Sequence, residues 1–190
     1  MNYLAHALLA EPYAHSVIGN IAGDLVKGHL GTHALHPRVA DGVRRHRRVD
    51  VLTDSHGSYI ALKAYFPQGH RRYSGLILDV LFDHYLVCHW QRFSHWSRDA
   101  FLEDTYRVLR DNSRLLPPGL AAVAPSWVDA DWLRVYETRE GVAAVLMRLS
   151  KRLSRPVDLV SLLQVASANE ADFERGFLQV FADVQRAINL

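Results

Sequence analysis

Hydrophobic residues recur every three to four positions along almost the whole chain, which is the spacing of one face of an α-helix. No stretch alternates apolar and polar residues strongly enough to predict a β-strand. The pattern therefore predicts an all-α fold. Helices are expected in the segments 36–54, 73–90, 98–116, 129–154 and 157–190, with a break near Thr138 in the fourth segment and a turn at 167–169 in the fifth.

Proline and serine residues indicate where three of these helices begin or end. Pro37 suits a first helical position, because its ring fixes φ near the helical value. Ser74 is a candidate N-cap for the second helix, since a serine hydroxyl can accept from a main-chain N–H of the first turn. The third helix is expected to stop at Pro117, which cannot continue it.

Composition is that of an ordinary globular protein, with 190 residues, 49% hydrophobic and 22% charged. We therefore expect one helical domain over residues 1–190. The single cysteine, Cys88, cannot form an internal disulfide and fits a reducing compartment. No secretory leader and no apolar run of membrane-spanning length is visible, so we expect a cytoplasmic protein without membrane contact.

Charge is distributed unevenly. The net charge of +2 is too low for a polycation that binds nucleic acid, and we expect no nucleic-acid partner. Five arginines nevertheless lie between residues 38 and 50, beside only two aspartates. A local positive patch of this kind indicates an anionic partner. The 11 histidines point further toward metal or phosphate chemistry.

The segment "VRRHRRVDVLTD", residues 43–54, sets an imidazole and two carboxylates among arginines. A helical residue advances by about 100°, so His46, Asp50 and Asp54 follow one stripe. Val43 lies on nearly the same face and marks it as the inner one. The stripe fits two interpretations. It is either one wall of a site rimmed by guanidinium groups, or a solvated basic helix with an ordinary His–Asp contact.

A second segment, "LDVLFDHYL", places Asp79 and Asp83 four residues apart on an apolar stripe. Two ionised carboxylates are costly to bury alone, and like charges at this spacing repel each other. A cation, a metal or a shared proton would offset that cost, so a functional interpretation is favoured for both residues. His84 follows directly and fits either a site residue or a hydrogen-bonded core histidine.

Two further segments add candidate metal donors. In "GNIAGDLVKG", Asp24 follows Asn20 by one helical turn. The glycines beside them would let the backbone come close to a neighbouring helix. His6, in "MNYLAH", fits a ligand or a partner of one. Mixed imidazole and carboxylate donors suit Mn²⁺, Mg²⁺, Fe or Zn²⁺, and the excess of hard oxygens favours Mn²⁺ or Mg²⁺.

Together with neighbouring arginines, such a metal suits the hydrolysis of a phosphate ester. The metal would polarise a phosphoryl oxygen, and guanidinium groups would bind the phosphate with two hydrogen bonds each. No P-loop and no serine-nucleophile motif competes with this interpretation, and "GNIAGD" lacks the preceding strand that a dinucleotide-binding loop requires.

Four segments of the first half of the chain, "MNYLAH", "GNIAGDLVKG", "HRRVDVLTD" and "LDVLFDHYL", resemble in order and spacing the motifs of the acyl carrier protein phosphodiesterase family. The resemblance implies an all-α fold distantly related to HD-domain metal phosphohydrolases. It implies hydrolysis of the phosphodiester that joins 4′-phosphopantetheine to a serine of holo-acyl carrier protein. The implied cofactor is a divalent metal, Mn²⁺ by preference, with Mg²⁺ or Fe possible.

This chain departs from the usual HD order of His, adjacent His-Asp and Asp. His46 is followed by Arg47, and the adjacent pair is inverted as Asp83-His84. We therefore carry over only the positions that match the family's own motifs. Metal ligands are expected at Asp24, His46, Asp50, Asp79 and Asp83. Catalytic roles are expected for His6 and His84 among these positions. Arg47 is also expected to act in catalysis, by neutralising charge on the phosphoryl oxygens.

The resemblance also implies an acidic protein partner, because carrier proteins of this type are strongly acidic helical bundles. A basic surface is the electrostatic complement of such a partner. Contacts to substrate or partner are expected at Arg44, Arg45, Arg48, Asp54, Arg71 and Arg72.

Two alternatives remain open from the sequence. The first is an HD-type phosphohydrolase that acts on nucleotides or another small phosphoester. The second is a non-enzymatic binder that recognises an acidic partner through the arginine-rich helix.

Overall fold

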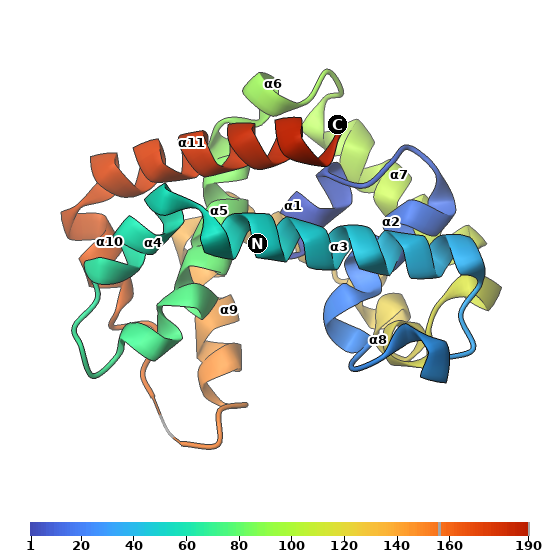
Figure 1. The fold of residues 1–190 in the computed structure, drawn as a ribbon, viewed down its shortest axis with the longest axis horizontal. Coiled ribbons are helices and arrows are strands. Elements are labelled where there is room, and N and C mark those ends of the chain that lie inside the picture. Colours follow the sequence, from blue (N-terminus) through green and yellow to red (C-terminus); the bar gives the residue numbers. More distant parts are fainter. Residues whose placement is uncertain (156, 190) are drawn as a thin grey trace. The chain divides into compact units, whose positions relative to one another are not determined.

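The structure is a computed structural model that describes residues 1–155 and 157–189. Its regular elements are helices, and no strand occurs among the described residues, which confirms the all-α prediction (Figure 1). Contacts divide the chain into two compact units that are interleaved along the sequence. Unit 1 consists of Met1–Asn2, Leu52–His89 and Val135–Leu190. Unit 2 consists of Tyr3–Val51 and Trp90–Arg134.

Each unit has its own set of helices. The helices of unit 1 are α4 (Gly57–Ala64), α5 (Ser74–Cys88), α9 (Arg139–Ser150), α10 (Leu163–Ala168) and α11 (Glu170–Ile188), with the 3₁₀ turn η3 (Arg71–Tyr73). Those of unit 2 are α1 (Tyr3–Leu8), α2 (Ala14–Ala22), α6 (Trp90–Phe93), α7 (Arg98–Asp111) and α8 (Pro118–Asp129), with the 3₁₀ turns η1 (Gly23–Leu25), η2 (Leu30–Thr32) and η4 (Ser113–Leu115). Helix α3 (Pro37–Ser55) and turn η5 (Trp132–Glu137) pass from one unit to the other. The single domain expected over residues 1–190 stays a prediction.

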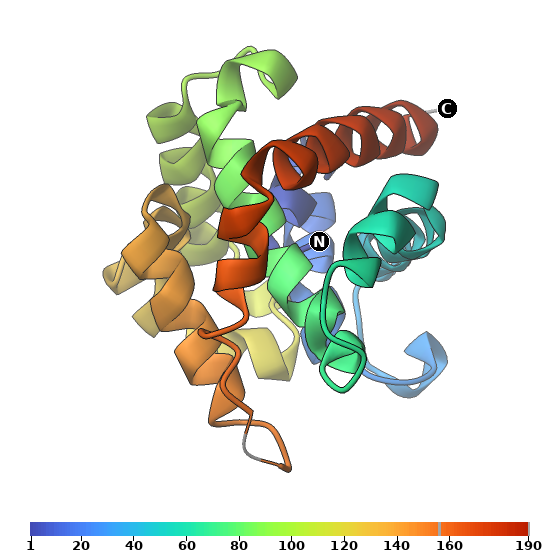
Figure 2. The ribbon, with the colours of Figure 1, turned by 90° about the vertical axis from the view of Figure 1, so that its left-hand side faces the viewer.

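Unit 1 is built around aromatic side chains. Helix α11 lies against α4 and α5, and α9 lies against α5 (Figure 2). Phe82 of α5 packs edge-to-face on Phe177 of α11 with ring centroids 5.3 Å apart. Gly176 lets α11 approach α4, because a Cβ there would lie 2.8 Å from Leu62. Buried rings of this size dominate the stability of a core.

Unit 2 has an aliphatic core, in which α2 lies against α1, α7 and α8. Ile18 and Ile21 of α2 are fully buried in it. Val39 and Val43 of α3 reach the same core, one turn apart. This burial confirms that the inner face of α3 is the face predicted from the sequence, and the next residue along that face is His46.

Most of the predicted helices form, with some different ends. Pro37 is the first residue of α3, as expected. The predicted break lies at Thr138, which caps α9, but the helix expected before it is the 3₁₀ turn η5. The prediction that Ser74 is the N-cap was wrong by one position. Tyr73 is the N-cap, and Ser74 is the first residue of α5. The hydroxyl of Ser74 donates to the carbonyl of Arg71. The helix expected to reach Pro117 ends at Asp111, because a 3₁₀ turn intervenes.

None of the helices in the described ranges combines the length and the apolar character that a membrane span needs.

Candidate metal centre

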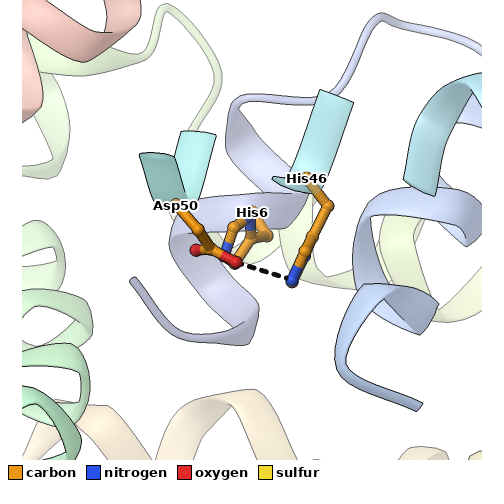
Figure 3. A group of neighbouring side chains, drawn as sticks. All are labelled: His6, His46 and Asp50. Atoms are coloured by element: carbon orange, nitrogen blue, oxygen red, sulfur yellow. Dashed lines mark ion pairs between the residues drawn. The ribbon is translucent and has the colours of Figure 1, made fainter. Parts of the chain in front are cut away.

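His6, His46 and Asp50 bring their side chains together in unit 2 (Figure 3). His46 and Asp50 lie one turn apart on α3, and His6 reaches them from α1. Oδ1 of Asp50 lies 3.1 Å from Nε2 of His6, and Oδ2 lies 3.1 Å from Nε2 of His46. The two rings stack with centroids 3.7 Å apart. One carboxylate thus bridges two stacked imidazoles.

The orientation of His46 is fixed by α2. Nδ1 of His46 donates to the main-chain carbonyl of Asn20 at 2.8 Å, and a carbonyl can only accept. The proton therefore sits on Nδ1, and the lone pair of the neutral ring sits on Nε2, which faces Asp50. A histidine that is held in this way is preset to offer Nε2 to a metal.

Two glycines of the segment "GNIAGD" let this arrangement form. A Cβ on Gly23 would lie 2.1 Å from the His46 ring, so only a glycine leaves room for the imidazole. A Cβ on Gly19 would lie 2.3 Å from the carbonyl oxygen of Val39 and 2.6 Å from Cα of Gly42. Helices α2 and α3 therefore cross in main-chain contact, which confirms the close approach that the glycines predicted.

Asp24 lies at the outer side of the cluster. It is in η1, directly after Gly23, and its Oδ1 is 3.8 Å from Nε2 of His46. Its side chain is 52% exposed, whereas those of His6 and His46 are 2% and 4% exposed. The other neighbour of Asp24 is the ammonium of Lys27, at 3.9 Å. Asp24 therefore approaches the site from the solvent side.

The charges in the cluster are strongly coupled. Burial acts to lower the pKa of His46, but the interactions with Asp24 and Asp50 outweigh burial and raise that pKa to about 9. Burial lowers the pKa of His6 to about 4, against the opposing effect of Asp50. For Asp50 burial acts to raise the pKa, yet the two imidazoles hold it well below its usual range. Near neutral pH the metal-free cluster holds one charged ring, one neutral ring and one carboxylate.

The ring of His6 provides a test of fit for a metal. Both of its nitrogens are buried: Nδ1 makes no hydrogen bond with any residue in the described ranges, and Nε2 has the ion-pair contact with Asp50 at 3.1 Å. Leaving a buried polar atom without a partner costs roughly 1 to 3 kcal/mol. Two adjacent donors that each lie about 2.1 Å from an octahedral ion are about 3.0 Å from each other. The Asp50 oxygens lie at a similar distance, 3.1 Å, from Nε2 of His6 and of His46. The residues present therefore fit a divalent metal.

Asp79 and Asp83, from the segment "LDVLFDHYL", belong to α5, in unit 1. Asp79 accepts hydrogen bonds from the hydroxyl of Tyr59 at 2.8 Å and from the ammonium of Met1 at 3.0 Å. Asp83 is fully buried. Of the three ways to offset the charge that the sequence left open, the structure shows a cation beside Asp79, the main-chain ammonium of Met1. A shared metal site of these carboxylates with His46 stays a prediction.

His84 is also in α5 and is held at both nitrogens. Its Nδ1 donates to the main-chain carbonyl of Tyr136 at 2.8 Å, and its Nε2 lies 3.8 Å from Sγ of Cys88. The bond at Nδ1 fixes the orientation of the ring and directs Nε2 toward Cys88. The catalytic role predicted for His84 stays a prediction.

The arginines on α3 differ in what they contact. Arg44 is exposed and pairs with Asp41, one turn away. Arg48 is exposed as well. Arg45 and Arg47 are half-buried, and both donate to main-chain carbonyls. The arginine-rich run thus contains two outward and two inward side chains.

The other predicted contact residues lie in unit 1 and are exposed. The inward position predicted for Asp54 was wrong, because the stripe has turned toward solvent at the end of α3, where Asp54 pairs with the ammonium of Lys63 at 3.1 Å. Arg71 donates to a main-chain carbonyl at 3.3 Å, and the guanidinium of Arg72 lies over the ring of Tyr73, 4.7 Å from its centroid. Their part in binding a partner stays a prediction.

Sequence reasoning missed two features of the polar network. Tyr59 was not recognised as the partner of Asp79, because a tyrosine on another helix carries no signal of where its hydroxyl points. The carbonyl of Asn20 was missed as well, since every residue has one. The signal that was available is the pair of glycines, which marks the turn of α2 that must touch another helix.

Comparisons with known proteins agree with one another. The sequence model described as "Acyl carrier protein phosphodiesterase" matches residues 1–184. The acyl carrier protein phosphodiesterase of Serratia proteamaculans is 33% identical over 181 residues, covering 95% of this chain and 90% of the relative. That of Photorhabdus laumondii is 31% identical over 183 residues, covering 95% and 91%. That of Yersinia pestis is 29% identical over 188 residues, covering 98% and 96%.

No solved structure matched the chain, so the distant relation to HD-domain proteins stays a prediction. The family match spans both units, and the relatives are covered over nearly their whole length. It follows that the chain belongs to the acyl carrier protein phosphodiesterase family.

Proposed function

We propose that this chain is a metal-dependent phosphodiester hydrolase, which removes 4′-phosphopantetheine from the serine of holo-acyl carrier protein and leaves apo-acyl carrier protein. The observation that carries the proposal is the cluster of His6, His46 and Asp50 in a chain of a family with this name. Mn²⁺ is the metal we favour for these donors, with Mg²⁺ and Fe as the other candidates. The cytoplasmic location expected from the sequence stays a prediction.

A divalent ion at this cluster would polarise a phosphoryl oxygen and lower the pKa of a water. The chain's own contribution is to hold the donors in place. The carbonyl of Asn20 keeps Nε2 of His46 directed at Asp50. Asp50 offers both of its oxygens, one to each ring. Asp24, on the solvent side, is a further carboxylate that we assign to the ligand set.

Among the predicted catalytic groups, His6 is better suited to bind metal than to transfer a proton. Its side chain is 2% exposed, and its pKa is lowered to about 4 by burial, so it is a neutral donor near pH 7. We assign it as a ligand. His84 remains our candidate for proton transfer at Nε2, since its Nδ1 is already engaged. Asp79 and Asp83 remain proposed ligands.

The exposed arginines are our candidates for binding the acidic carrier protein. Arg44 and Arg48 lie on α3, and Arg71 and Arg72 lie in η3. The ion pair between Arg44 and Asp41 is exposed, and such pairs are weak enough to exchange with a partner's carboxylate. Exposed basic side chains raise the rate of encounter with an acidic protein.

Mass spectrometry of the carrier protein tests the proposal. Holo-acyl carrier protein incubated with this chain and Mn²⁺ should lose the mass of the phosphopantetheine arm, and free 4′-phosphopantetheine should accumulate. A chelator should stop the loss, and added Mn²⁺ should restore it. His46→Ala should abolish turnover, whereas His29→Ala, which removes an exposed histidine of the same unit, should not.

An unchanged carrier-protein mass with metal-loaded, folded protein would exclude the proposed reaction. Release of phosphate from nucleotides under the same conditions would instead favour the HD-type phosphohydrolase. Binding of the carrier protein without any turnover and without metal would favour the non-enzymatic binder.

A further inference from the structure

Two of the four arginines around His46 form hydrogen bonds that tie α3 to the segments carrying His6 and Asp24. We propose that Arg45 and Arg47 are positioning residues of the metal centre, and that neither contacts the substrate. The inference rests on the proposed metal-dependent function, but the geometry that carries it is present without a metal. It assigns different tasks to residues that the sequence presents as one basic run, "RRHRR".

Arg47 holds the chain that follows Asp24. Its guanidinium Nη2 donates to the carbonyl of Val26 at 3.0 Å and to the carbonyl of Gly28 at 2.8 Å. Gly28 has φ of 77°, a left-handed conformation that favours glycine, so the chain turns sharply where the guanidinium is bound. The Arg47 side chain thus binds the turn at Val26 and at Gly28, and Val26 is two residues after Asp24.

Arg45 holds the end of the helix that carries His6. Its Nε donates to the carbonyl of Leu9 at 2.6 Å, directly after α1 ends at Leu8. The last carbonyls of a helix lack partners within the helix and carry a partial negative charge, so a guanidinium there is doubly favoured. The bond fixes α1 against α3 within one turn of His6.

Helical geometry explains why these two arginines, and not their neighbours, point inward. Relative to His46, the positions directly before and after it are rotated by about 100° to either side. Arg45 and Arg47 therefore lie on the two sides of His46, where each can contact a neighbouring segment. Arg44 and Arg48 are rotated by about 200° and point away from it, in agreement with their exposure. One stretch of α3 thereby joins three elements that carry predicted ligands.

The consequence concerns metal affinity rather than substrate contact. Donors that must gather from three elements bind a metal well only if those elements are already held in place, because ordering them on binding would cost free energy. Loss of a partner that orients a ligand typically lowers metal affinity by about 10- to 100-fold. We expect a loss of this size when either arginine loses its carbonyl bonds.

The experiment compares four glutamine variants on one helix: Arg45→Gln and Arg47→Gln, with Arg44→Gln and Arg48→Gln as controls matched in charge. Mn²⁺ affinity is measured by calorimetry, and kcat and KM are measured with holo-acyl carrier protein. Nitrogen chemical shifts of the histidine rings are recorded by NMR in metal-free protein. Circular dichroism establishes that each variant is folded, and Arg45→Lys and Arg47→Lys provide milder replacements.

The inward variants should bind Mn²⁺ about 10- to 100-fold more weakly and shift the ring signals of His6 or His46. The outward variants should keep both properties and raise only KM. Arg47→Lys should recover part of the loss, because an ammonium can still donate to Val26 or Gly28. Normal affinity and ring signals in folded Arg45→Gln and Arg47→Gln would overturn the inference, most directly if KM alone rose.

The NMR measurement separates this inference from the proposed function. If the wild-type protein shows neither Mn²⁺ binding nor turnover, the proposed function fails. The ring signals of the metal-free variants still report whether the two arginines position the histidines.

Discussion

The main-chain carbonyl of Asn20 accepts the Nδ1 proton of His46 at 2.8 Å, so the tautomer of the central histidine is set by backbone and not by a side chain. Many metal-binding histidines are oriented by a carboxylate, which a single substitution can remove. A carbonyl is present whatever residue occupies position 20. The orientation of His46 therefore depends on where α2 lies, and the contacts that place α2 become the sensitive positions.

Asn20→Ala should separate stability from metal binding. The buried amide of Asn20 donates to the carbonyl of Ser16, and its loss should lower the free energy of unfolding by about 1 kcal/mol. The carbonyl that holds His46 remains, so Mn²⁺ affinity should stay within a few-fold of wild type. Thermal unfolding and calorimetry check the two expectations, and a large loss of affinity in a folded variant would contradict them.

Gly23→Ala should weaken Mn²⁺ binding as well as lower stability. The added Cβ would lie 2.1 Å from the ring of His46, so the imidazole or η1 must move. Overpacking of this kind costs roughly 1 to 3 kcal/mol, and here the displaced group is a metal donor. Gly57→Ala, where a Cβ meets nothing within 4 Å, is the matched control. Equal Mn²⁺ affinity in the two variants would show that the ring position is not critical.

Asp50→Asn should remove most metal affinity. Asp50 is the carboxylate shared by both rings, and an amide supplies a weaker oxygen without charge. The loss should exceed the about 100-fold that an orienting partner costs, because Asp50 itself is a proposed ligand. The pKa of His46 should fall in the same variant, which NMR titration measures. Asp41→Asn removes an exposed aspartate of the same helix and should change neither property.

Metal-free protein should be most stable near pH 6.5. The pKa of His46 is raised to about 9, so between pH 6.5 and 9 the folded protein keeps a proton that the unfolded chain has released, and stability falls as pH rises. The pKa of His6 is lowered to about 4, so below pH 6.5 the unfolded chain binds a proton that the folded ring excludes, and stability falls as pH falls. The lowered pKa of Asp50 adds a further loss in acid.

Calorimetric Tm values of chelated protein across this range check the expectation. Saturating Mn²⁺ should remove the fall in Tm above pH 6.5. A ligand must lose its proton to bind metal, so metal binding stabilises the folded protein more as pH rises. A Tm of chelated protein that stays level between about pH 7 and 9 would contradict the raised pKa of His46.

KM for the carrier protein should rise with ionic strength. Exposed charges separated by more than about 8 Å are largely screened at physiological salt, so a basic docking surface loses its attraction as salt increases. Arg44→Gln and Arg48→Gln together should raise KM at low salt and flatten its salt dependence, with kcat unchanged. A KM that does not respond to salt in the wild type would remove the docking assignment.

The sequence predicts the face of α3 well and the partners of that face poorly. Val39, Val43, His46 and Asp50 follow a helical period, and the structure buries the first three on one side. The helical periodicity does not predict which other element packs against that face. The stacking of His6 on His46, which joins α1 to α3, is a tertiary contact between residues forty positions apart, and nothing local in either segment encodes it.

Charge patterns were harder still to interpret. The sequence treats Arg45 and Arg47 as members of a basic surface, yet both donate to carbonyls of neighbouring segments. For Asp79 the sequence left a cation, a metal and a shared proton open, and the structure shows the ammonium of Met1. In each case the residue type was informative and its partner was a main-chain group, which carries no signature in the sequence.

The contact of Gly19 with Gly42 has a consequence for how the protein tolerates change. Because α2 and α3 meet backbone to backbone there, removing atoms from core side chains cannot bring the two helices closer together. Val39→Ala or Val43→Ala should therefore lower stability while leaving the span of the donor cluster intact. The positions of the donor atoms thus depend more on this main-chain contact than on which small aliphatic side chains fill the surrounding core.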